Sequence, residues 1–223
     1  CWKVKFTMVQ HFARLLYSLS TTREAVAIMV CDAVLEEVRI GMETNILVHT
    51  QRRLCLMKYL TELYRFKLVD GKVIFNVLYS LLSSAPWMDH PDNYFRCKLV
   101  CTLLDGCGAY FLRGGERSKG QLQDFLVYFQ RYAFFTKPQP LPSDTEITIS
   151  DTLELLGGGA MQMYDTIEEV DAEIQRIEEV AQRAKLAQAA KLKPGPGTAD
   201  IGGASGGLSR ASMEQVNEAE GDE

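Results

Sequence analysis

The feature that most restricts the fold of this chain is the helical period of its apolar residues. These residues recur three and four positions apart within residues 48–66, 93–111 and 121–135. In the first stretch they are Leu54, Met57, Leu60 and Tyr64. In the second they are Cys97, Val100, Cys101, Leu104, Cys107 and Phe111. This spacing puts them on one face of a helix, and no comparable stretch shows the alternation of a strand. We therefore predict an all-α chain.

Turn-forming residues divide this pattern into about seven helices before Gly157. Ser20-Thr21-Thr22 can cap a helix that starts near Arg23, and Ser143 and Glu146 have the spacing of a capping box. Antiparallel helix pairs of this size, joined by short links, build helical-repeat solenoids. No internal sequence similarity is visible, so a globular helical bundle is the alternative.

Three regions follow from the change in composition along the chain. We expect a helical domain over residues 1–156, one long amphipathic helix over 164–192, and a disordered tail rich in Gly, Ala and acidic residues over 193–223. The long helix either packs on the domain or pairs as a coiled coil. The chain opens inside a helical pattern without an initiating Met. We therefore expect a fragment of a longer protein.

Charge and cysteine content exclude several classes of protein. Residues 1–156 hold 18 basic and 16 acidic side chains, and residues 157–223 hold 6 and 13. The domain is thus nearly neutral, which argues against a nucleic-acid binder that relies on bulk positive charge. No apolar run reaches the roughly 18 residues of a membrane span, and no signal peptide is visible. Six cysteines lie within apolar runs, so we expect a reduced intracellular protein.

No arrangement of residues indicates catalysis, a cofactor or a metal. Cys97 and Cys101 are one helical turn apart, but they lie in an apolar stripe rather than in the turns that present zinc ligands. Buried structural cysteines are the better interpretation. The three histidines are scattered, and neither a phosphate-binding loop nor a nucleophile motif is present. We expect no enzyme.

Small basic groups leave an RNA-binding patch open as a possibility. They consist of Arg52 with Arg53, and of Arg113, Arg117 and Lys119 around a Gly-rich turn. Each group holds only two or three charges, so ordinary solvated helix ends are the alternative.

The helix expected over residues 23–43 carries the most informative pattern. At about 100° per residue, Asp32, Glu36 and Glu43 fall within about 40° of one another. We call these three residues the acidic stripe. Arg39 lies beside the stripe, whereas Glu37 lies about 140° from Asp32. The opposite, core-facing side carries Val30, Cys31, Val34, Val38 and Met42. Acids spaced in this way repel one another mildly, and a basic partner would relieve the repulsion.

Several blocks of the sequence also resemble a known family. They are residues 31–43, Gln51-Arg52-Arg53, Glu62-Leu63-Tyr64, Val73-Ile74-Phe75, and residues 99–105, 125–132 and 149–156. In order and spacing they are similar to the third middle-domain module of the second Up-frameshift protein family, the regulators of nonsense transcripts. The chain departs from that family in two shorter connections, at residues 84–93 and 138–142, and in a weaker acidic run after the module.

The resemblance implies a fold and a partner. The fold is a stack of HEAT-like helix pairs, as in the middle domain of initiation factor 4G. The function is that of a non-enzymatic scaffold in cytoplasmic or perinuclear mRNA surveillance, which docks the ribonucleoprotein-type domain of the third Up-frameshift protein. The family's acidic docking residues correspond to Asp32, Glu36 and Glu43, with Glu37 as a weaker candidate. The family's helicase-binding segment is absent, so this fragment is not expected to bind the helicase. The alternative is an RNA-binding scaffold like the initiation-factor relatives.

Overall fold

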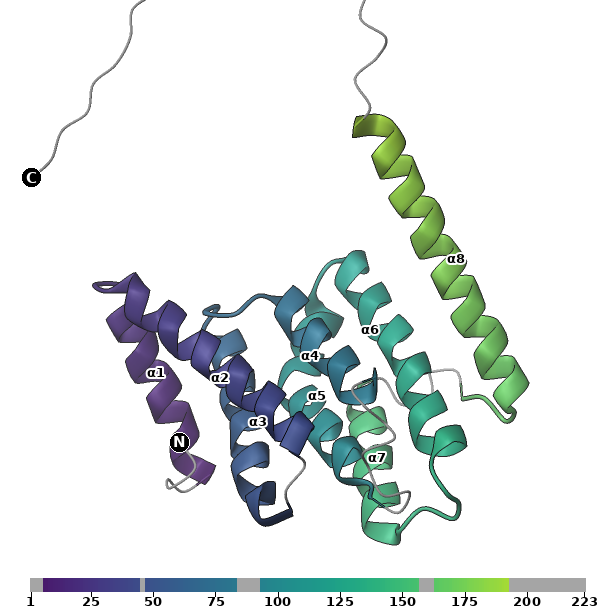
Figure 1. Ribbon diagram of the computed structural model, residues 1–223, viewed down its shortest axis with the longest axis horizontal. Helices are drawn as coiled ribbons and strands as arrows, with labels where there is room; N and C mark the ends of the chain where they lie inside the picture. Colours follow the sequence, from purple (N-terminus) through teal and green to yellow (C-terminus); the bar gives the residue numbers. More distant parts are fainter. Residues whose placement is uncertain (1–5, 45–46, 84–92, 157–162, 193–223) are drawn as a thin grey trace, which may run out of the picture. The chain divides into compact units, whose positions relative to one another are not determined.

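The computed structural model describes residues 6–44, 47–83, 93–156 and 163–192. These residues form helices and no strands, as predicted (Figure 1). The α-helices are α1 (Val9–Ser20), α2 (Glu24–Thr44), α3 (Thr50–Arg65), α4 (Gly71–Ser83), α5 (Phe95–Arg113), α6 (Glu116–Gln130), α7 (Ser143–Leu155) and α8 (Ile167–Leu192). Short 3₁₀ turns η1 (Phe6–Met8) and η2 (Leu47–His49) precede α1 and α3, and a π-helical segment η4 (Arg131–Thr136) continues α6.

Alternate helices pack side by side and run in the same direction. Along α3 and α5, Tyr64 and Phe111 have ring centroids 5.2 Å apart, and Thr61 lies against Gly106. Along α5 and α7, Lys98 pairs with Asp144 at 2.5 Å, and about two turns further along both helices Thr152 donates to Asp105 at 2.8 Å. The intervening helices form a second layer, in which α4 contacts α6. This arrangement is the predicted solenoid of HEAT-like helix pairs.

The core lies between the two layers of helices. Helix α3 is the most central helix in it. This helix contacts α1, α2, α4 and α5, so it is buried on more than one side. Met57 and Leu60 are buried as predicted, while Leu54 and Tyr64, at the edges of the predicted face, are only half-buried. On α2, the predicted core residues Cys31, Val34, Val38 and Met42 are buried, and Val30 is half-buried.

The start of α7 differs from the sequence-based prediction. The helix begins at Ser143 as expected, but Pro142 occupies the N-cap position and no capping-box hydrogen bond forms. The amide groups of Thr145 and Glu146 donate to the Pro142 carbonyl instead. The Asp144 carboxylate pairs with Lys98 on α5, so this acidic residue ties two helices together.

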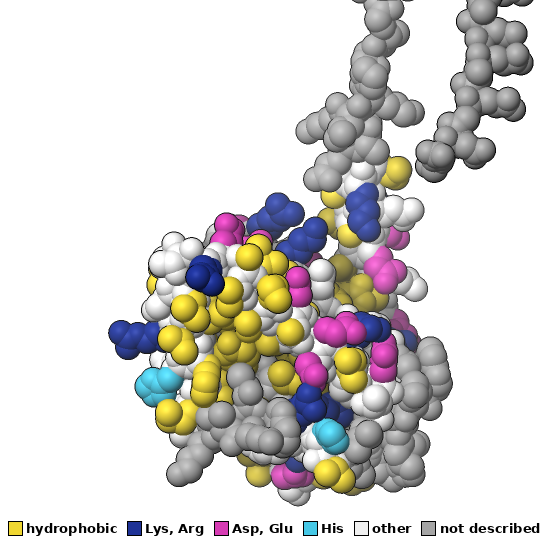
Figure 2. Space-filling model, turned by 60° about the vertical axis from the view of Figure 1, so that its left-hand side comes forward, with side chains coloured by type: hydrophobic (Ala, Val, Ile, Leu, Met, Phe, Trp, Pro, Cys, Tyr) yellow, Lys and Arg dark blue, Asp and Glu magenta, His cyan; other side chains and the backbone are white. Residues whose placement is uncertain are grey.

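The first helix pair exposes several large apolar side chains. On α1 the exposed apolar side chains include Phe12, Leu15 and Leu19, and on α2 they include Ile28 and Met29. Figure 2, in which the side of Figure 1 that carries α1 and α2 comes forward, shows hydrophobic side chains gathered on this face.

The first turns of α8 pack against the domain. Val170 is fully buried, Arg131 pairs with Asp171 at 2.5 Å, and the Tyr128 hydroxyl donates to Glu178 at 3.3 Å. The chain divides into two compact units, Cys1–Gln182 and Arg183–Glu223. In the second unit, the structure describes only the end of α8. The predicted tail (193–223) and the loop between α4 and α5 (84–92) lie outside the described residues. In the part that is described, no helix is long and apolar enough to cross a membrane.

Candidate protein-docking site

The acidic stripe lies on the solvent face of α2, opposite the residues that anchor this helix to the core. Asp32, Glu36 and Glu43 are all exposed, while Val34 and Val38 are buried. Because buried and exposed positions each recur at helical spacing, burial of the apolar face orients the carboxylates outward. The stripe extends over about 16 Å, because Asp32 and Glu43 are eleven rises of 1.5 Å apart.

Arg39 forms ion pairs with two of the three stripe residues. Its guanidinium donates to both carboxylate oxygens of Glu36, at 3.0 and 2.6 Å, and to Oε1 of Glu43 at 2.7 Å. The hydrogen bond from Arg39 lowers the pKa of Glu36 below its usual value. Arg39 therefore relieves part of the expected repulsion within the helix, the part between Glu36 and Glu43. The surface remains acidic, with three negative charges against one positive charge.

Glu37 belongs to a different face of α2, as the helical wheel predicts. Its carboxylate forms an ion pair with Arg52 at the start of α3. This pair connects α2 to α3 and engages one of the basic residues proposed for RNA binding. Glu37 therefore supports the position of the acidic helix rather than extending the stripe.

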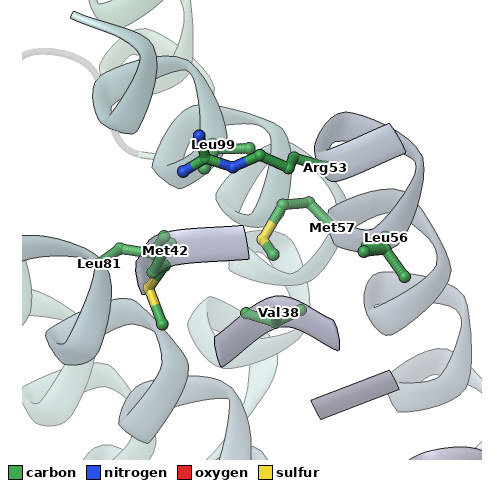
Figure 3. Close-up of a pocket in the computed structure, with 7 residues that line it drawn as sticks. All are labelled: Val38, Met42, Arg53, Leu56, Met57, Leu81 and Leu99. Carbon is green, nitrogen blue, oxygen red and sulfur yellow. The ribbon is translucent and has the colours of Figure 1, made fainter. Parts of the chain in front are cut away.

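Arg53, another RNA-binding candidate, is a core residue. Only 5% of its surface is exposed, and its guanidinium carbon lies 4.7 Å from the centroid of the Phe95 ring. Figure 3 shows its side chain extended toward Leu99, at a pocket that is also lined by Val38, Met42, Leu56, Met57 and Leu81. The pocket here has a volume of about 10 Å³, which is room for about one water. This burial disfavours Arg53 as a contact for an RNA phosphate.

The remaining basic candidates lie far from Arg52. Arg113 ends α5, and Arg117 and Lys119 lie in the first turn of α6, where Lys119 pairs with Glu116 at 2.9 Å. Arg53 packs at the other end of α5, against Phe95. The eighteen rises of 1.5 Å from Phe95 to Arg113 amount to about 27 Å of helix. The fold thus separates the two basic groups instead of joining them in one patch.

The five cysteines within the described residues are free and buried, as predicted. Burial raises the pKa of Cys97 to about 11 and that of Cys101 and Cys107 to about 12. Metal ligation needs the thiolate, which this environment disfavours. Among the described residues, no group of three or more His, Cys, Asp and Glu side chains is arranged to hold a metal ion.

Sequence reasoning missed a group of apolar side chains next to the acidic stripe. Ile28, Met29 and Ile40 are all exposed on α2. Ile40 also lines a groove of about 190 Å³ between α2 and α3, together with Glu37, Gly41, Thr44, His49, Arg52, Arg53 and Leu56. The wheel that identified the stripe would have placed these apolar residues beside it, but only the structure shows that the described helices leave them exposed.

Comparison with known proteins shows the family to which this chain belongs. The model of the MIF4G domain matches residues 1–156. The chain is 42% identical over 191 residues to "Regulator of nonsense transcripts 2" of Mus musculus and of Homo sapiens, an alignment that covers 79% of this chain and 15% of each relative. It is 39% identical over 183 residues to "Regulator of nonsense transcripts UPF2" of Arabidopsis thaliana, with the same shares covered. The resemblance seen in the sequence blocks is confirmed, and the chain spans about 15% of the length of these relatives.

Proposed function

Because the chain belongs to the MIF4G domain family, we propose that it is a non-enzymatic scaffold module of nonsense-mediated mRNA decay. In this proposal, the acidic stripe docks the ribonucleoprotein-type domain of the third Up-frameshift protein, in the cytoplasm or its perinuclear region. The observation that carries the proposal is the set of three exposed carboxylates on one face of α2. That set occurs in a chain 42% identical to mammalian regulators of nonsense transcripts 2.

The charge of the stripe supports a basic partner. Three carboxylates and Arg39 leave a formal charge of −2 on one face of α2. Such a surface accelerates the encounter with a basic domain and disfavours acidic ones. Because these groups are exposed, salt screens them over about 8–10 Å, so binding should weaken as the salt concentration rises.

RNA enters this proposal as a ligand of the assembled complex. An RNA site on the domain alone has less support, because Arg53 is buried and Arg52 is paired with Glu37. Arg113, Arg117 and Lys119 form one small group at a single turn.

Charge reversal at Glu43 tests the proposed docking site. Glu43→Arg changes the local charge by two and sets a like charge beside Arg39. We expect the affinity for the purified ribonucleoprotein-type domain to fall at least about tenfold. Calorimetric titration at two salt concentrations measures this affinity, and circular dichroism checks that the helix content is unchanged.

Glu154→Arg is the matched control. Glu154 is exposed in the last turn of α7, as Glu43 is in the last turn of α2. Both reversals change the net charge of the chain equally, so a general charge effect would weaken both variants alike. We expect the Glu154 variant to bind within about twofold of the wild type. Equal binding by the Glu43 variant and the wild type would rule out the stripe as the docking site.

A further inference from the structure

Helix α2 exposes large apolar side chains on the same face as its carboxylates. The exposed fractions are 54% for Ile28, 70% for Met29 and 40% for Ile40. Figure 2 shows acidic side chains close to the hydrophobic ones on this face of the molecule. Single exposed apolar residues are ordinary on protein surfaces, but contiguous ones mark interaction sites.

Helical geometry makes the apolar and acidic residues neighbours. Residues three and four positions apart have Cβ atoms about 5–6 Å from each other. Ile28 and Met29 therefore flank Asp32, and Ile40 lies between Glu36 and Glu43. The two kinds of side chain form one mixed surface that extends over about 23 Å from Ile28 to Glu43.

We propose that Met29 and Ile40 are the apolar anchors of the docking surface, so that the partner presents apolar side chains between its basic ones. This inference rests on the proposed function. Exposed ion pairs contribute little net affinity, whereas desolvated apolar contacts near the centre of an interface contribute most of it. The carboxylates then act mainly on partner choice and rate of encounter, and the anchors act on residence time.

The groove between α2 and α3 gives one partner side chain a place to bind. It has a volume of about 190 Å³, and Ile40 is part of its wall. An apolar side chain placed there would cover Ile40 and lie next to the Glu37–Arg52 pair. The mixed character of this surface favours a folded basic domain over RNA, because the carboxylates repel phosphates. It also disfavours a lysine-rich tail, which has no apolar groups to bury.

Alanine substitutions distinguish the contribution of the apolar anchors to the affinity from that of the charged residues. Met29→Ala and Ile40→Ala are titrated with the ribonucleoprotein-type domain of the third Up-frameshift protein over a salt series. We expect each to reduce the affinity at least about fivefold, with the slope of log K against log salt unchanged. Glu43→Arg should reduce both the affinity and the slope. Ile147→Ala, on α7 and 60% exposed, should bind like the wild type.

Each outcome decides between the two proposals. If both anchor variants bind like the wild type while Glu43→Arg loses affinity, the proposal of apolar anchors is wrong and the proposal of the acidic docking site is supported. If Glu43→Arg binds like the wild type while the anchor variants lose affinity, the proposal that the acidic stripe docks the partner is wrong and the proposal of apolar anchors is supported. If the wild type does not bind the domain, both proposals are wrong. Thermal melting of each variant excludes a folding defect, which is not expected at positions this exposed.

Discussion

Arg39 sets how much negative charge α2 presents to a partner. It holds both oxygens of Glu36 and one oxygen of Glu43, so a basic partner must share these carboxylates with it. Arg39→Gln removes the competing charge and leaves all three acids in place. We expect tighter binding of the basic domain, by about threefold to tenfold at low salt, and a steeper salt dependence. Calorimetric titration of the variant measures both.

The opposite result at this position would also be informative. If Arg39→Gln binds more weakly, Arg39 acts by holding the carboxylates in a geometry suited to binding, and its positive charge is not the main effect. Arg176→Gln is a suitable control, because Arg176 forms a similar exposed pair with Glu173 on α8, outside the docking face.

Single residues also show where sequence reasoning about the site reached its limit. The positions of Asp32, Glu36 and Glu43 followed from helical spacing alone, because α2 has one buried face. Arg53 could not be assigned in this way. It follows Arg52 in a short basic run, but α3 is surrounded by four helices, and these neighbours are not visible in the local sequence. Burial of Arg53 over Phe95 depends on a residue 42 positions away.

At the scale of the helices, close approach between α3 and α5 depends on Gly106. A Cβ atom at this position would lie 2.0 Å from Cγ2 of Thr61, whose hydroxyl donates to the Met57 carbonyl. That hydrogen bond limits rotation of Thr61 away from a new methyl group. We expect Gly106→Ala to lower the free energy of unfolding by about 1–3 kcal/mol, measured by denaturant titration.

Gly120→Ala provides the comparison for this substitution. A Cβ atom at Gly120 would have no neighbour within 4 Å, so only the helix propensity changes. Stability should rise by up to about 1 kcal/mol. If Gly106→Ala were as stable as Gly120→Ala, the two helices would not be held at the separation described here.

The helices were largely predictable from the sequence, because the apolar period and the turn-forming residues indicate the same helix boundaries. The start of α7 at Ser143 coincides with the predicted boundary, and α5 ends at Arg113, next to the Gly-rich turn seen in the sequence. The capping of α7 was not predictable from Ser143 and Glu146 alone. The carbonyl of Pro142 receives the amide hydrogen bonds, and a residue on another helix, Lys98, engages Asp144.

At the scale of the whole molecule, the packed structure continues beyond residue 156, where the family match ends. The contacts of α8 at Val170 and Asp171 belong to the first compact unit. Sequence reasoning left open whether this helix packs on the domain or self-associates, because a stripe of apolar residues suits both. The burial of Val170 favours packing for the first turns, whereas Val180 on the same helix is exposed.

A charge placed at these two valines distinguishes a docked helix from a free one. Val170→Asp puts a carboxylate into a fully buried position, close to Asp171, so we expect a loss of about 2–4 kcal/mol of stability or release of α8. Val180→Asp carries the same change at an exposed position and should leave stability within about 0.5 kcal/mol. Hydrogen exchange of α8 and thermal melting report the two effects separately. If residues 167–178 were equally protected from hydrogen exchange in the two variants, the stability of α8 would not depend on its contacts with the domain. The partner titration provides a further test, because the acidic stripe lies on α2, so release of α8 should leave docking unchanged.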